Sequence, residues 1–399
     1  MHKAFQFFLL LSILLPLFSE TEKFSDYNLK EPVRFKMVTE FLSSEKIHYF
    51  VYSETILLDG KIHSEIAGVV DFLHAYAVSA RKWKGSREFF RVLLQYSEVL
   101  PQEFLLKILE MVFSAFPIEF ADKIEEIYNV TQHPKILSIS YLYLKNAGKN
   151  PSPDRLKSLQ EPLPHLLLRE EDESNLPPLI DLFRHWKTDR KVAIVLRLPQ
   201  KKLSYLYLRG EGDRWIRFPY PVNTLSVTGL PFFLTNGNTP QGLYKFKKIV
   251  RSSNPRIGPS PAIQLALPYE TSASDFFGNP ETRGFGREEI ASLLPESWKD
   301  FEPAYQTMIA GKLGRSGIWI HGSTLNPSFF SKKKHGLTWT YGCISLPEIW
   351  EQGKLKQSAQ EKLLQVWNAD YVFVVEILKE NLESWEELEE WLRSPENRG

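Results

Sequence analysis

The sequence predicts an α+β protein with more than one domain, in which an all-α helical array precedes a mainly antiparallel β domain. Apolar residues recur at helical spacing before about residue 187. After residue 190, short runs rich in aromatic and β-branched residues take over, with Gly, Pro and Asn between them. The length of 399 residues also exceeds that of one typical domain.

An export signal (signal peptide) is expected over residues 1–19. Lys3 makes the start positive, residues 4–18 are almost entirely apolar, and Ser19 is a small residue suited to cleavage. The apolar run is shorter than a comfortable membrane span. We therefore expect no stable membrane span after cleavage, and an uncleaved membrane anchor is the alternative.

The balance of charge excludes some classes of partner. Removal of residues 1–19 takes away Lys3 and no acid, so the formal net charge falls from +1 to 0. Such a chain has no electrostatic basis for binding nucleic acid. Its histidines are not spaced as metal ligands, and the glycines of residues 283–287 lack the spacing of a dinucleotide fingerprint. We therefore expect no metal and no cofactor.

A helical domain is expected over residues 20–189. Apolar residues lie at helix spacing in residues 104–113 and again in residues 124–142. Prolines, which are tolerated in the first turn of a helix, stand near three expected helix starts, at Pro101, Pro117 and Pro134. Residues 146–178 are rich in Pro and acidic residues, which predicts a loose connection. Partner binding is the expected role of this domain, and a plain helical bundle is the alternative.

The β domain is expected over residues 190–378. Its strand-forming runs are residues 192–198, 203–208, 243–249, 318–320 and 371–375. Residues 379–399 are expected to form a C-terminal helix and tail, with the helix at 380–394 and Trp385, Leu388, Trp391 and Leu392 facing inward.

One cysteine and one histidine in the β domain suggest catalysis. Cys343 is the only cysteine in the chain, so it cannot form an internal disulfide. It follows Gly342, and His321 ends an apolar strand-like run twenty-two positions earlier. Because a thiol becomes a strong nucleophile when an imidazole accepts its proton, we interpret Cys343 as a nucleophile and His321 as its base. The Gly342 and Cys343 amides are the expected oxyanion donors, and the Gly322 carbonyl is the expected partner of the imidazole. An inert buried thiol is the alternative.

Two motifs around these residues resemble the signature of the L,D-transpeptidase (YkuD-type) catalytic domain. Gly317-Ile318-Trp319-Ile320-His321-Gly322 is similar to the family's strand that ends in His-Gly. Thr340-Tyr341-Gly342-Cys343-Ile344 is similar to its Ser/Thr-His-Gly-Cys segment. Upstream, Asn238-Thr239-Pro240-Gln241-Gly242 resembles the family's Thr-Pro-x-Gly turn. The resemblance covers about residues 190–378 and leaves out the helical region and the tail.

The resemblance implies a β-sandwich-like domain that acts on peptidoglycan stem peptides. Cys343 would attack the amide after an L-centre of a tetrapeptide, release the terminal D-alanine and hold the rest as an acyl-enzyme. His321 would act as base and then as acid, with Gly322 orienting it. Thr340 and Gly342 would shape the loop that carries the nucleophile. The implied roles are peptidoglycan biosynthesis, cell wall organisation and cell shape, in the periplasm or cell envelope of a bacterium, where envelope proteins are candidate partners of the helical domain.

Two positions depart from the family pattern. Tyr341 stands where the family usually has His, and Ser345 stands where it usually has Arg or Asn. These changes affect the choice of acceptor more than the class of reaction. Tyr341 remains a residue of the oxyanion and substrate loop, while Ser345 and Trp339 are candidates for the substrate groove. For the two aromatic residues, core packing is the alternative.

His335 is the rival base and a further candidate for the groove. It lies eight positions before Cys343, in a loop that contains three lysines. We favour His321, because a base needs rigid placement and His321 ends a strand.

The leading interpretation is therefore an exported, cysteine-dependent L,D-transpeptidase. An L,D-carboxypeptidase, in which water replaces the amine acceptor, uses the same residues, and the sequence does not distinguish the two. A non-catalytic scaffold of the cell envelope is the alternative from another class. Tyr341 and Ser345 support the scaffold, and the intact pair of Cys343 and His321 opposes it.

Overall fold

The computed structural model describes residues 86–157, 176–186, 191–251, 260–322, 340–351 and 354–397, apart from positions 96, 99, 101, 202, 211–213, 227 and 395–396. The chain divides into two compact units, residues 1–131 and 132–399. The expected export signal lies outside the described residues. Within the described part, every helix is too short or too polar to cross a bilayer.

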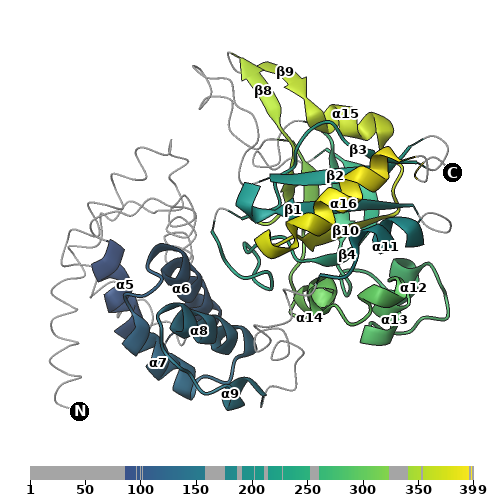
Figure 1. Cartoon of the computed structure of the whole chain (residues 1–399). Coiled ribbons are helices and arrows are strands. Elements are labelled where there is room, and N and C mark those ends of the chain that lie inside the picture. Colours follow the sequence, from purple (N-terminus) through teal and green to yellow (C-terminus); the bar gives the residue numbers. More distant parts are fainter. Residues whose placement is uncertain are drawn as a thin grey trace, which may run out of the picture. The chain divides into compact units, whose positions relative to one another are not determined.

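The described part of the first unit is helical (Figure 1). Its helices are α5 (Ser86–Gln95), α6 (Gln102–Ala115) and α7 (Ala121–Val130). Helix α6 buries Phe104, Leu105, Ile108 and Leu109, whose spacing places them on one face. The helical prediction is confirmed for these residues, and residues 20–85 of the predicted array lie outside the described part.

The second unit begins with the helices α8 (Pro134–Asn146), α9 (Asp154–Lys157) and α11 (Leu179–His185). Helix α8 starts as the sequence predicts, with Pro134 in its first turn. The ring of His133 caps this helix by accepting a hydrogen bond from the amide of Ile136 at 3.4 Å. Most of the predicted connection, residues 158–175, lies outside the described part.

Eight strands of the second unit form one sheet in the order β3-β2-β1-β10-β4-β5-β6-β7. Their bounds are β1 Val192–Leu198, β2 Leu203–Arg209, β3 Trp215–Arg217, β4 Gly242–Val250, β5 Ala262–Ala266, β6 Trp319–His321, β7 Ile344–Ser345 and β10 Tyr371–Glu376. The pairs β1–β10 and β6–β7 are parallel, and the other pairs are antiparallel. A separate hairpin joins β8 (Glu348–Glu351) to β9 (Lys354–Ser358). The predicted, mostly antiparallel β domain is confirmed.

The large sheet curls, because one segment bridges strands that are far apart in its order. Val222 pairs with Ser204 of β2, and the next residue, Asn223, pairs with Ser345 of β7. The two ends of the sheet are thereby linked through residues 222–223. The β domain is thus one curled sheet in place of two separate stacked sheets.

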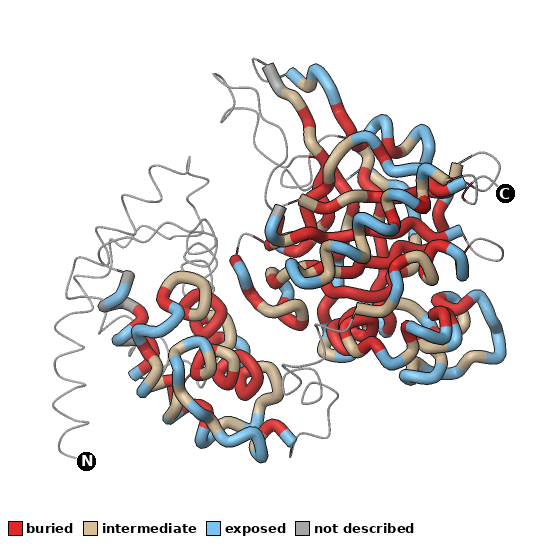
Figure 2. The backbone as a smooth tube through the Cα atoms, in the orientation of Figure 1, coloured by how far each residue is buried: buried red, intermediate tan, exposed pale blue. Residues whose placement is uncertain are grey.

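Both faces of the curled sheet are buried (Figure 2). One face carries Val195, Tyr244 and Ile320, which pack with residues of α14 (Gln306–Lys312) and α15 (Ala359–Val366). The opposite face carries Ile194 and Phe373. It is covered by α11, α12 (Ala273–Phe277), α13 (Arg287–Ala291) and α16 (Leu382–Arg393). This double burial explains why β1 reads as a continuous apolar run instead of an alternating one.

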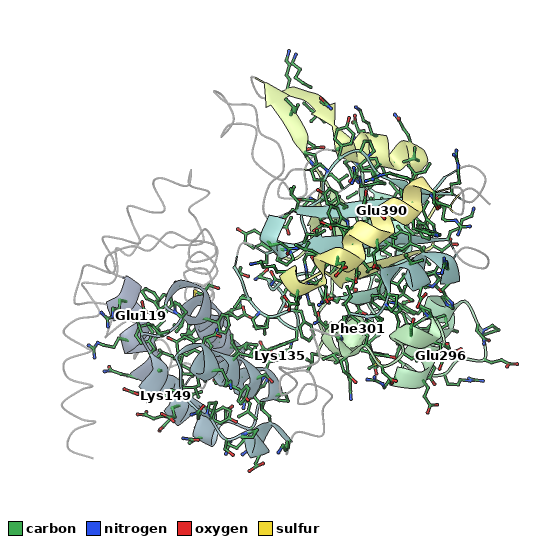
Figure 3. All side chains as sticks on the ribbon, viewed as in Figure 1. Glu119, Lys135, Lys149, Glu296, Phe301 and Glu390 are labelled. Atoms are coloured by element: carbon green, nitrogen blue, oxygen red, sulfur yellow. The ribbon has the colours of Figure 1, made fainter. Side chains whose placement is uncertain are left out.

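The predicted C-terminal helix is confirmed as α16. Leu388 and Trp391 are buried against the sheet, and Trp385 stacks on Tyr205 with ring centroids 5.8 Å apart. Glu390 lies on the exposed side of the helix (Figure 3). The helix therefore belongs to the core of the β domain, although it lies beyond the part of the chain that carries the family motifs.

Candidate active site

The parallel pairing of β6 with β7 brings together the segments that carry the predicted nucleophile and base. Ile320 pairs with Ile344, and His321 pairs with Ser345. The two isoleucines point into the core, so the alternation of side chains places His321 and Ser345 on the other face. Cys343 lies in the bend that precedes β7, two positions before Ser345. The pairing thus brings the segment that carries Cys343 next to the strand that ends in His321.

The main chain fixes the orientation of His321. Its Nδ1 lies 2.6 Å from the carbonyl oxygen of Gly322, and an N–H at Nδ1 makes Nε2 the basic nitrogen. The side chain is only 3% exposed. Burial lowers the pKa of His321 to about 4, against the opposing effect of its hydrogen bond to Gly322. At neutral pH the ring is therefore an uncharged base.

The thiol of Cys343 contacts Gly317, in the segment that precedes β6. Its side chain is partly exposed, and its thiol donates to the carbonyl of Gly317 over 3.6 Å. Burial raises the pKa of the Cys343 thiol, while a hydrogen bond from the Trp319 amide and the charge of Arg315 lower it. Among the described residues, the thiol therefore donates its hydrogen bond to the Gly317 carbonyl and not to the His321 imidazole.

The resting site differs from the ion pair that the sequence suggests. We expected the imidazole to lower the thiol pKa by taking up its proton. Instead, burial raises the pKa of Cys343 and lowers that of His321, so both neutral forms are favoured. The reason is that an ion pair in this site must remove two charges from water.

Thr340 stabilises the loop of residues 340–343, which carries the predicted nucleophile Cys343 and is called the nucleophile loop below. Its hydroxyl donates to the carbonyl of Cys343 at 2.7 Å and accepts from the amide of Gly342 at 3.3 Å. The Gly342 amide, which we expected to stabilise an oxyanion, is therefore directed to Thr340 in this state. Gly342 has φ +100°, a conformation that favours glycine.

The predicted Thr-Pro-x-Gly turn holds the nucleophile loop from the other side. The Thr239 hydroxyl lies 2.9 Å from the carbonyl oxygen of Gly342 and 2.7 Å from that of Thr224. The Tyr244 hydroxyl donates to the carbonyl of Pro240 at 2.6 Å and so braces the turn from β4. The three motifs that are separate in the sequence are thus joined at the nucleophile.

The remaining candidates are placed differently. Tyr341 is exposed beside Cys343. Ser345 is completely buried, and its main chain pairs with Asn223, so its side chain does not line an exposed groove. His335 and Trp339 lie outside the described residues.

Sequence reasoning missed two buried charged residues at this site. Arg315 is buried, and its guanidinium lies against Gly342. Glu348 accepts hydrogen bonds from the hydroxyls of Ser260 at 2.7 Å and Ser358 at 2.8 Å. Its carboxylate packs on Gly322, where an added Cβ would lie only 2.1 Å from an oxygen. Charged residues in a loop and a hairpin normally indicate surface positions, so the sequence offered no signal for their burial.

The described residues provide no group of three or more His, Cys, Asp or Glu side chains that could hold a metal ion.

The comparison with known proteins agrees with the geometry. The chain has no match among the curated proteins that were searched. Residues 191–359 match the model of the YkuD family, the L,D-transpeptidase catalytic domain. The match includes all three motifs and the β6–β7 pair. The segment of residues 191–359 is therefore similar to the L,D-transpeptidase catalytic domain of the YkuD family, as the motifs predict.

Proposed function

We propose that this protein is an exported peptidoglycan L,D-transpeptidase that works through an acyl-enzyme on Cys343. The observation that carries the proposal is the β6–β7 pairing, in which His321, bonded to the Gly322 carbonyl, pairs with Ser345 two positions after Cys343. The match to the family's catalytic domain over residues 191–359 supports the class of reaction. The expected substrate is a stem tetrapeptide of peptidoglycan.

In the first half-reaction His321 takes the thiol proton on Nε2 while the sulfur attacks the carbonyl carbon that follows the L-centre. The negative charge that develops on the carbonyl oxygen needs a nearby amide donor, and the Cys343 amide is the candidate. The C–N bond then breaks, and His321 returns its proton to the leaving nitrogen. D-alanine leaves, and the tripeptide remains as a thioester on Cys343.

In the second half-reaction an amine of another stem peptide attacks the thioester. His321 removes a proton from the amine, the C–S bond breaks, and the thiol recovers its proton. The product is an amide cross-link between two stem peptides. With water as the attacking group, the same steps release a free tripeptide, which is the L,D-carboxypeptidase alternative.

The neutral resting pair suits this cycle. A base with a pKa of about 4 stays unprotonated at neutral pH, and it accepts the thiol proton only when its surroundings raise that pKa. Because the imidazolium and thiolate are both unfavourable in the buried site, they form only when substrate or nearby charge compensates. The raised thiol pKa then limits wasteful reaction of Cys343 with other electrophiles.

The test is mass spectrometry of the products after the protein is incubated with disaccharide-tetrapeptides. Cys343→Ala and His321→Asn serve as the matched inactive variants. Cross-linked dimers that require both residues support transpeptidation, and free tripeptides alone indicate the carboxypeptidase. If neither product nor any acyl-enzyme forms, the proposed activity is wrong and the non-catalytic envelope scaffold takes its place.

A further inference from the structure

We propose that Arg315 is a positioning residue of the nucleophile loop, whose buried guanidinium fixes Gly342 against residues 232–238 and keeps a positive charge beside the Cys343 thiolate. The inference rests on the proposed role of Cys343 as nucleophile. Its first test, however, measures thiol chemistry without any substrate.

Arg315 is held in the interior between two segments of the chain. It is 1% exposed, which is rare for an arginine. Its Nη1 donates to the carbonyl of Asn238 at 2.7 Å and to that of Phe232, and its Nη2 donates to Gly237 at 2.8 Å. The planar guanidinium thus binds several carbonyls of one turn at fixed angles, which a lysine ammonium does not reproduce.

The same guanidinium packs against Gly342 of the nucleophile loop. A Cβ added to Gly342 would lie 2.2 Å from Nη2 of Arg315 and 2.3 Å from the carbonyl oxygen of Gly237. The backbone next to Cys343 therefore rests directly on the arginine and on one of the carbonyls that it binds. Movement of the Arg315 side chain displaces the peptide that carries the nucleophile.

The segment that supplies Arg315 also contacts the thiol itself. Gly314 and Gly317 flank Arg315 and Ser316, with φ +79° and +75°. The carbonyl of Gly317 accepts from the thiol, and its amide donates to a carboxylate oxygen of Glu270 at 3.1 Å. Residues 314–317 thus supply both the Arg315 guanidinium that packs against the nucleophile loop and the Gly317 carbonyl that accepts a hydrogen bond from the thiol.

The other ionisable groups around the sulfur do not supply this charge. His321 is neutral at pH 7, and burial raises the pKa of Tyr244, so that its phenol is neutral as well. Glu270 is negative and binds the amides of Leu267 and Gly317. Arg197 is paired with Glu376 over 2.5 Å. Of these groups, Arg315 is the cation whose charge acts on Cys343.

The consequence concerns the step in which the thiol loses its proton. Burial opposes both the thiolate and the imidazolium, as described above. A fixed cation favours the thiolate, and an opposite charge at close range typically lowers an acid's pKa by about 1–3. Arg315 thereby provides a positive charge at a site where Tyr341 offers no imidazole.

The first test is the pH profile of alkylation by iodoacetamide in the full chain. Cys343 is the only cysteine, so every alkylated thiol reports on this site. The test variant is Arg315→Met. The matched control is Arg209→Met, which removes another buried arginine that binds the Trp186 carbonyl and lies over the Trp215 ring.

We expect the alkylation rate at pH 7 to fall about tenfold in Arg315→Met, with the profile moved to higher pH, and to stay near the wild-type value in Arg209→Met. An unchanged profile in a folded Arg315→Met protein overturns the proposal. This outcome is independent of whether the protein has transpeptidase activity.

Arg315→Lys separates geometry from charge and serves if Arg315→Met does not fold. Lysine keeps the charge but not the planar fork, so we expect an alkylation profile near that of the wild type. In product formation from tetrapeptides, kcat should fall about tenfold with little change in KM. If Arg315→Lys keeps both the alkylation profile and kcat, the guanidinium is dispensable and the positioning role is wrong.

Discussion

The burial of His321 predicts that acid destabilises the folded catalytic domain through this one side chain. The pKa of His321 is about 4 in the folded protein and 6.5 in an ordinary exposed histidine. Because the folded-state pKa is the lower one, the unfolded chain binds the proton first as the pH falls. The stabilising contribution is therefore complete above about pH 6.5 and is lost as the pH falls toward 4.

The magnitude follows from the gap between the two pKa values. Each tenfold difference in proton affinity is worth about 1.36 kcal/mol. Between pH 7 and pH 5 the loss from His321 is about 2 kcal/mol, and by pH 4 it is about 3 kcal/mol. These amounts are a large fraction of the stability of a typical domain.

The assay compares the wild type with His321→Gln by urea unfolding at pH 7, 6, 5 and 4. Tryptophan fluorescence reports the second unit, since Trp83 is the one tryptophan of residues 1–131 and the other nine lie in residues 132–399. Glutamine is polar but does not titrate, and all other titrating groups are common to both proteins. We expect the free energy of unfolding to fall by about 2 kcal/mol more in the wild type than in the variant between pH 7 and pH 5. Parallel pH dependences in the two proteins would refute the neutral, buried state of His321.

Three substitutions test other contacts of the fold and site. Gly342→Ala, with φ +100° and a Cβ against Arg315, should lower the free energy of unfolding by at least about 2 kcal/mol, and an unchanged thermal midpoint would contradict the described loop. Thr340→Val, which loses the hydrogen bond to the Cys343 carbonyl, should reduce kcat about tenfold in product assays. Full activity would show that this hydrogen bond is not needed to hold the nucleophile loop in place. Leu388→Ala should cost about 2–5 kcal/mol in urea unfolding, whereas no cost would show that α16 is dispensable for the β domain.

The longer elements were predictable because their patterns are local. The strands β1 and β10 are nearly continuous apolar runs, β2 is rich in aromatic residues, β4 alternates with period two, and α16 has helical periodicity. The expected runs did not include β3, β5, β7, β8 and β9, all of which have five residues or fewer. Their pairing depends on neighbours that lie far away in the chain, which no local pattern encodes.

The chemical core of the site was predictable for a related reason. Cys343 and His321 stand in motifs whose residue types the chemistry requires, and the Gly322 carbonyl lies beside the ring as expected. Arg315 and Glu348 were not predictable, because their burial comes from tertiary packing around the curled sheet. The neutral resting state of Cys343 and His321 was missed for the same reason, because the burial of these side chains cannot be inferred from their spacing in the sequence.

The most direct measurement of the central claim is the intact mass of the protein after brief exposure to a tetrapeptide donor without an amine acceptor. We expect the wild type to gain the mass of the tripeptide acyl group, which equals that of the tetrapeptide less D-alanine. The added mass should map to Cys343, and Cys343→Ala should gain nothing. A D-alanine-releasing reaction that proceeds without this adduct and survives in Cys343→Ala would contradict nucleophilic catalysis by Cys343.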